Sequence, residues 1–562
     1  MDDSPGRRFG LRRNEPMPTA NAAPPAALPP YAGLNTYASD PVLAACLDTA
    51  VDEGTEETLM ALGAYWGSAE AHEVARIAST NPAKLRRCDY EGAPIHQVEL
   101  HPAFHALLNR STMSGLTSAA WEEGEGRRQH RLRAATLYLT AQCERGHLTA
   151  VSATHASVAA LAYAPDLEAE LFPLIARRRY DRRAVPMADK EGVHIALAVA
   201  ETHTGFDRAD VAMRADSASA IAGLGGLTVT GEKVFVCHPS ADLLLVLART
   251  IDGPTAAIVP RYAPENLQAV RVTDLRTVDG LTAAPIASVS FRSATARLIG
   301  EPGRGLQVLR DVRTLTQLDA ALMAAGAMRA AVTRAVHHAR YHAVLGRPLV
   351  AHALQARILA DMALESAAQT ALSLRLARAF DQAFDSDGDH ALARVVTPAA
   401  RLYALKAAQM VAAEACECIG LNATVSEHPL ARIRADIGAL GQWEGTANEG
   451  ILELAQMIER DANVLRDALD EIAADLGEAN ADLIDDVRDL AERSTGDVGL
   501  LRAFAEQLAM IAAAAALRRN VPRAVADAYI QTRLRERQRI SFGGLDTPFD
   551  AAALLDFITP ED

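Results

Sequence analysis

The sequence predicts a mainly α-helical protein with a β domain inserted between helical regions. Long Ala-rich stretches with apolar residues at helical spacing occupy both ends of the chain. Short β-branched or apolar runs are confined to residues 191–300, and glycines punctuate them. A chain of 562 residues has room for about three to four domains.

The first part of the chain is predicted to be a tail followed by helices. Residues 1–35 are rich in Pro, Ala, Asn and Arg, which is typical of a disordered tail. Residues 36–190 are predicted to form an N-terminal helical domain, in which one helix begins at Pro41 and another spans 132–149. The stretch 165–186, with Pro173 inside it, is predicted to be an interrupted connection.

Residues 191–300 have the pattern of a β domain. Their apolar runs are the length of strands and are separated by turn residues. This spacing predicts a small β-barrel or sandwich. The predicted strands are 194–199, 227–230, 234–236, 243–247, 256–259 and 287–291.

Helical patterns return after residue 300. Residues 301–460 are predicted to form a helical bundle and residues 461–562 a further C-terminal helical domain. In the latter, apolar side chains recur every three or four residues, with acidic residues between them as a solvated face. This stripe consists of Leu465, Leu469, Ile472 and Leu476.

Composition narrows the class of protein. The net charge of −15 argues against attraction of the whole protein to nucleic acid. No run of about 18 apolar residues is found, so no membrane span is predicted. The N-terminal arginines are followed by no apolar stretch, which argues against a signal peptide. Six cysteines without a C-x-x-C pair fit reduced thiols in a cytoplasmic protein.

The most informative motif is the segment 443–448, Trp-Glu-Gly-Thr-Ala-Asn. It resembles the catalytic-base segment of the acyl-CoA dehydrogenase superfamily, in which a carboxylate removes a proton alpha to a thioester while a flavin accepts hydride. The resemblance implies that Glu444 is the base. Glu444 could instead cap a helix that begins near Asn448.

Weaker matches in the same order extend the resemblance along nearly the whole chain. They include Asn81-Pro82, His101-Pro102-Ala103, the segment 231–233, Pro348-Leu349 and Thr532-Arg533. With the extra C-terminal helical domain, the chain resembles the AidB-like subgroup. The resemblance implies an N-terminal helical domain, a β-barrel, a four-helix bundle and the extra helical domain. It also implies FAD, a homotetramer or homodimer, and a small acyl substrate, as a thioester of coenzyme A or of a carrier protein.

The positions that match the family's flavin contacts are altered. The segment Val199-Ala200-Glu201 lacks a hydroxyl, Gly205-Phe206-Asp207 has a ring where the family has a serine, and Val234 replaces a tryptophan. His342 replaces an arginine that reaches a neighbouring subunit's flavin. Thr282 replaces another arginine, and the family's Gly-Gly-x-Gly turn reads 420–423, Gly-Leu-Asn-Ala. The other expected cofactor contacts are Thr154, Phe235, Val236, Trp443, Gly445, Thr446 and Asn448.

These substitutions leave three functions open. In the first, the chain is an acyl-CoA dehydrogenase-like flavoprotein oxidoreductase with a pocket rebuilt for FAD. Alternatively, it is an FAD-free relative that uses Glu444 for redox-neutral proton transfer, as an isomerase or lyase. A step in specialised metabolism fits either enzyme better than general fatty-acid oxidation.

The third function is that of a non-catalytic scaffold or nucleic-acid-binding protein. A member of the AidB-like subgroup binds DNA through its C-terminal domain. The basic residues of this chain considered for the same role are Arg533, Arg535 and Arg537. The alternative that these arginines form ion pairs on the surface or at a subunit interface is favoured. His338 and His342 share a helix face, but no third ligand is suitably spaced, so no metal site is predicted.

Overall fold

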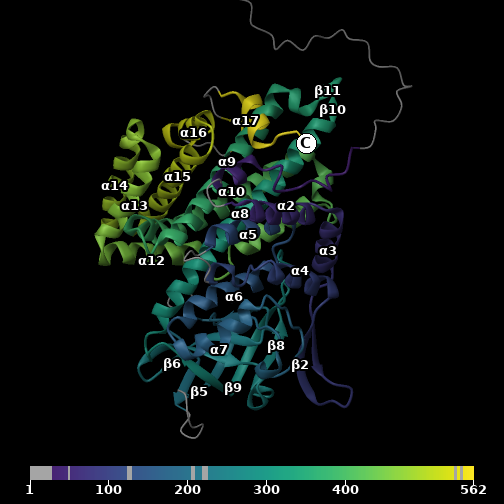
Figure 1. Ribbon diagram of the computed structural model, residues 1–562, viewed down its shortest axis with the longest axis vertical. Coiled ribbons are helices and arrows are strands. Elements are labelled where there is room, and N and C mark those ends of the chain that lie inside the picture. Colours follow the sequence, from purple (N-terminus) through teal and green to yellow (C-terminus); the bar gives the residue numbers. More distant parts are fainter. Residues whose placement is uncertain are drawn as a thin grey trace, which may run out of the picture. The chain divides into compact units, whose positions relative to one another are not determined.

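Helices and one small hairpin form the first part of the chain in the computed structural model (Figure 1). The structure describes residues 28–47, 51–122, 129–203, 209–217, 226–536, 541–544 and 549–561. Most of the predicted tail, residues 1–27, therefore lies outside the described residues. The helices are α1 (Pro41–Leu47), α2 (Glu53–Trp66), α3 (Ala69–Thr80), α4 (Pro102–Met113), α5 (His130–Cys143), α6 (Leu148–Leu161) and α7 (Pro165–Ala176).

Two features of this region differ from the sequence-based expectation. The stretch from Pro165 is helix α7, because Pro165 occupies the first turn, where its missing N–H costs nothing, and Leu167, Leu171 and Ile175 bury one face. The hairpin of β1 (Lys84–Cys88) and β2 (Pro94–Glu99) was not predicted. Most of its residues are exposed, so it has no alternating apolar pattern to recognise.

The β domain contains one seven-stranded sheet that closes on itself. Strands run in the order β3-β6-β4-β5-β9-β7, β8 is added to β9, and β7 pairs back with β6. Four predicted strands match β3, β6, β7 and the first part of β9, whereas the two predicted at 227–230 and 234–236 are one long strand, β5. The bounds are β3 (Ile195–Ala198), β4 (Arg214–Ser217), β5 (Gly226–Cys237), β6 (Leu243–Thr250), β7 (Gly253–Pro260), β8 (Val270–Leu275) and β9 (Ile286–Ile299).

Three long antiparallel helices follow the sheet and carry much of the core. They are α8 (Gly305–Tyr341), α9 (Ala353–Gln382) and α10 (Asp387–Ile419). Their alanines allow close approach, and nearly every side chain in the middle of each helix is buried. The short hairpin of β10 (Ala343–Val344) and β11 (Arg347–Pro348) joins α8 to α9. Helices α11 (Pro429–Leu440) and α12 (Ala447–Arg460) flank the turn that contains Glu444.

The C-terminal helices pack against α9 and α10, except α14, which packs against α15 and α13 (Figure 1). They are α13 (Ala462–Leu476), α14 (Ala481–Gly496), α15 (Leu501–Asn520), α16 (Arg523–Tyr529) and α17 (Ala551–Ile558). The predicted stripe of α13 is buried as expected. The helical stretch Val498–Asn520 is long and apolar enough to cross a membrane, contrary to the sequence-based expectation. However, 67% of its most apolar window is buried by the protein, as in a core helix.

Candidate active site

A cavity of about 720 Å³ lies where the sheet meets the turn before α12. Its wall is mostly apolar and comes from three parts of the chain that are far apart in sequence. Nine of the predicted site residues line it together: Val199, Ala200, Glu201, Val234, Phe235, Trp443, Glu444, Gly445 and Thr446. Cavities of this size and polarity are typical of small-molecule sites.

Glu444 has an unusual backbone conformation in this wall. Its φ of 54° lies in the left-handed region, which costs a non-glycine residue free energy. The buried Arg401 of α10 holds the turn: its Nη2 donates hydrogen bonds to the carbonyl oxygens of Trp443 at 2.8 Å and Gly445 at 2.6 Å. Arg401 therefore fastens the residues on both sides of Glu444, whose side chain lines the cavity.

The turn also starts a helix. Thr446 is the N-cap of α12, and its backbone N–H donates to the Glu449 carboxylate at 3.0 Å. Glu449 in turn forms an ion pair with the buried Arg313 of α8 at 3.5 Å. Helix capping is thus carried by Thr446 and Glu449. Glu444, two residues earlier, lines the cavity, so the helix-cap interpretation of Glu444 is not needed to explain the turn.

Cys237 lies in the same wall and was not predicted as a site residue. Burial, and after it the negative charge of Glu444, raises the pKa of its thiol to about 12, although the side chains of Thr149 and Trp443 oppose this rise. The thiol is therefore protonated at neutral pH. Trp443 Nε1 is buried without an oxygen or nitrogen acceptor, so the wall beside Glu444 presents an unsatisfied donor.

The strand side of the wall is built by a buried ion pair and a bulge. Lys233 Nζ contacts Glu201 Oε1 at 2.6 Å, and Glu201 also accepts from the backbone of Ala212 and Met213. The register of β5 against β9 shifts between Lys233 and Val236. In this bulge Phe235 has a φ of 55° and leaves 56% of its surface exposed at the cavity. Its ring is thus available to contact a ligand.

Four predicted contacts are not among the residues that line the cavity. Thr154 is buried, and its hydroxyl bonds the N–H and C=O of Ile195, which fastens α6 to β3. Val236 belongs to the core under the sheet. Asn448 lies in the first turn of α12. His342 is exposed at the end of α8, where its ring stacks on His338. Gly205 and Phe206 lie outside the described residues.

The arginines considered for nucleic acid have protein partners. Arg533 is only 2% exposed at its side chain and forms ion pairs with Asp361 at 2.6 Å and Glu365 at 2.9 Å. Arg535 pairs with Asp482. Arg537 lies outside the described residues. The position of Arg533 fits ion pairing within the protein rather than nucleic-acid binding, because a phosphate cannot reach a guanidinium that is buried between two carboxylates. In the described part of the chain, no cluster of His, Cys, Asp and Glu could hold a metal ion.

The cavity fits the ring system of a flavin better than its phosphates. Its volume, its apolar wall, the exposed Phe235 ring and the unsatisfied Trp443 donor suit a flat heteroaromatic ring with acceptor atoms. However, no lysine, arginine or histidine is among the described residues that line it. Cationic side chains that bind the diphosphate of FAD would therefore have to come from residues outside this wall.

Comparisons with known proteins agree with the fold. Residues 27–182 match the model of the "Adaptive response protein AidB N-terminal domain", and residues 303–458 match that of the "Acyl-CoA dehydrogenase, C-terminal domain". The putative acyl-CoA dehydrogenase AidB of Escherichia coli is 31% identical over 80% of this chain and 81% of its own length. The chain therefore belongs to the acyl-CoA dehydrogenase family. Within that family it is AidB-like.

Solved structures show the same fold. Caenorhabditis elegans ACDH-11 in complex with C11-CoA is 19% identical and has a TM-score of 0.81, covering 93% of this chain and 94% of that one. A glutaryl-CoA dehydrogenase of Mycobacterium smegmatis in complex with FADH2 is 15% identical and has a TM-score of 0.54. It covers 74% of this chain and 97% of that one.

Proposed function

We propose that the chain oxidises a small acyl thioester at its α and β carbons, with Glu444 as the base. The observation that carries the proposal is the position of Glu444: its backbone is strained, Arg401 binds the carbonyls on either side of it, and its carboxylate lies in the wall of an apolar cavity. Such strain is retained where the surrounding structure enforces it, and it is concentrated at functional sites.

The residues around the cavity have distinct parts in this reaction. The carboxylate of Glu444 accepts the α proton, while Arg401 keeps it pointed at the substrate. The apolar wall excludes water and so strengthens the interaction of the carboxylate with the acidified carbon. The Trp443 indole N–H donates to an acceptor on the bound molecules. The neutral Cys237 thiol does not compete with Glu444 for the proton.

FAD, the cofactor that fits this family and this cavity, would supply the hydride acceptor, because no protein side chain can accept hydride. The residues that would hold its ring are Val199, Val234, Phe235 and Trp443. His342, on the exposed β10–β11 side of α8, is the residue that we propose for contact with the flavin of a neighbouring subunit in a homo-oligomer. The substrate carrier is coenzyme A or a carrier protein.

A second candidate is redox-neutral proton transfer without flavin. The absence of any cationic side chain among the described lining residues favours it, because a dinucleotide would be weakly held. Glu444 would then remove a proton beside a carbonyl and return it to another carbon, as in an isomerase.

The test uses the FAD-loaded full chain and a panel of acyl-CoA thioesters under anaerobic conditions. We expect one chain length or branching pattern to bleach the flavin absorbance, and Glu444→Gln to lose bleaching while it still binds FAD. The surface variant Glu91→Gln, on the β1–β2 turn, should behave as the wild type. A Glu444→Gln variant that bleaches at the wild-type rate would refute the assignment of the base.

A further inference from the structure

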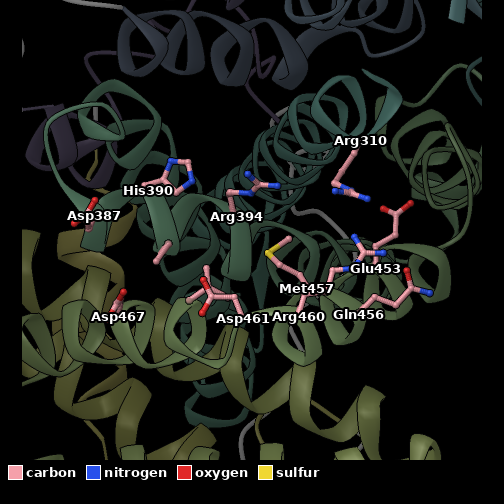
Figure 2. Close-up of a pocket in the computed structure, with 12 residues that line it drawn as sticks. Arg310, Asp387, His390, Arg394, Glu453, Gln456, Met457, Arg460, Asp461 and Asp467 are labelled. Atoms are coloured by element: carbon pink, nitrogen blue, oxygen red, sulfur yellow. The ribbon is translucent and has the colours of Figure 1, made fainter. Parts of the chain in front are cut away.

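A second pocket lies at the far end of α12 from Glu444 and is lined by charged side chains. Its volume is about 360 Å³, and its wall comes from α8, α10, α12 and α13 (Figure 2). Three arginines from three different helices face it: Arg310 of α8, Arg394 of α10 and Arg460 of α12. We refer to this pocket as the arginine cleft.

The arginines of the cleft have no partner within the described residues. None of the three guanidinium groups forms a hydrogen bond or an ion pair with another described side chain or carbonyl. This contrasts with the neighbouring arginines, because Arg313 pairs with Glu449 and Glu453, and Arg466 pairs with Asp467. A guanidinium presents several donors in a fixed fork that matches phosphate oxygens. The cleft thus keeps three such forks free.

The acidic side chains of the cleft are already committed to the protein. Asp461 caps α13 by accepting from the N–H of Asn463 at 3.0 Å. Asp467 pairs with Arg466 at 2.9 Å, and Glu453, which also lines the cleft, pairs with Arg313. Asp387 lies in the first turn of α10, where a negative charge is favoured by the helix dipole. None of these described carboxylates forms an ion pair with the three arginines.

Two of the aspartates lie apart from Arg310 in the cleft. In Figure 2, Arg310 lies at the right of the pocket, beside Glu453, whereas Asp387 and Asp467 lie at the left. A ligand that matches this arrangement has an anionic group at one end and hydrogen-bond donors at the other. A nucleic-acid duplex does not match, because its unbroken row of phosphates would be repelled by the aspartates at the opposite side.

We propose that the arginine cleft binds a small phosphate ester whose other end carries N–H or O–H donors. Nucleoside phosphates and sugar phosphates have this chemistry. The phosphate would be held by Arg310, Arg394 and Arg460, and the donors would face Asp387 and Asp467. This site is separate from the cavity of Glu444, so its occupancy does not depend on the proposed reaction.

Calorimetry of the full chain with adenosine 5′-monophosphate and with ribose 5-phosphate tests the proposal. We expect saturable binding of at least one, and no binding of adenosine. Arg394→Gln and Arg460→Gln should each weaken binding by about tenfold or more, since each loses charge-assisted hydrogen bonds. Both should keep the wild-type melting temperature, because no described partner is lost. Whether one ester or both bind distinguishes a nucleotide from a sugar phosphate.

Two control variants separate the cleft from general charge effects and from the active site. Arg488→Gln removes an exposed arginine of α14 and should bind as the wild type. Glu444→Gln should also bind as the wild type, which keeps this result independent of the dehydrogenase proposal. Binding by neither ester, equal binding of adenosine, unchanged affinity in both arginine variants, or tighter binding of duplex DNA through these arginines would each overturn the proposal.

Discussion

Replacing Arg401 by Met should release the turn that presents Glu444. Methionine fills much of the same volume but removes the two hydrogen bonds from Nη2 to the carbonyls of Trp443 and Gly445. A hydrogen bond from a charged donor contributes about 1.5–3 kcal/mol. The turn is partly exposed, so water can replace part of this, and the net loss for the turn is about 2–4 kcal/mol.

Amide hydrogen exchange followed by mass spectrometry measures this loss directly. Peptides that cover residues 442–449 should exchange about 30- to 1000-fold faster in Arg401→Met, because each 1.4 kcal/mol is a factor of ten. Arg401→Lys keeps the charge but not the fork, so its effect should be intermediate. As a matched control, Arg432→Met removes another arginine-to-carbonyl hydrogen bond, to Cys143, and should leave these peptides unchanged.

Normal exchange of residues 442–449 in Arg401→Met would show that Arg401 does not hold this turn. Equal acceleration by Arg432→Met would show the same, because the effect would then be global. Loss of the hold on Glu444 should accompany faster exchange, so Arg401→Met should also lose turnover without losing affinity for FAD.

Three further predictions follow from buried charges. Glu444→Gln removes a negative charge that raises the pKa of Cys237, so iodoacetamide should label Cys237 faster in this variant at pH 8. Equal labelling of the variant and the wild type, measured by peptide mass spectrometry, would contradict the proximity of Glu444 and Cys237. Burial raises the pKa of Glu144, but its bonds to His147 outweigh burial and lower the pKa to about 2, below its ordinary value of 4.5. The contribution of Glu144 to stability is therefore complete above pH 4.5 and is lost as the pH falls toward 2. Urea unfolding of Glu144→Gln should accordingly depend less on pH in this range than unfolding of the wild type. Arg533→Met leaves Asp361 and Glu365 buried without their cation and should cost about 3–5 kcal/mol in unfolding free energy, whereas a cost below about 1 kcal/mol would show that the C-terminal segment is not fastened there.

The sequence predicts the parts of the fold that have a strong apolar period. The stripe of α13 and the runs that form β3, β6 and β7 are examples. Strands β4 and β8 escaped prediction, because they are short and mixed in polarity. Helix α7 was not predicted because Pro173, which lies inside it, indicates an interruption. The burial of Leu167, Leu171 and Ile175 on one face stabilises the helix despite this proline.

The candidate site was predicted in part for similar reasons. The motif around Glu444 is local, so it could be recognised in the sequence. Arg401 lies more than 40 residues away from that motif, and only the packing of α10 brings the two together. Phe235 faces the cavity because of a bulge, and no residue pattern indicates where β5 shifts its register. Arg533 has the same identity whether it contacts phosphate or a buried carboxylate, so its burial had to come from the structure.

The visible absorbance spectrum of the freshly purified full chain, before and after addition of FAD, shows whether the cavity beside Glu444 binds a flavin. We expect flavin bands near one FAD per chain after addition, with a shifted spectrum that indicates an apolar environment around the ring. The variant Phe235→Ala should then bind FAD more weakly. A spectrum without bound flavin at saturating FAD would contradict the dehydrogenase proposal and leave redox-neutral proton transfer at Glu444 as the function to test.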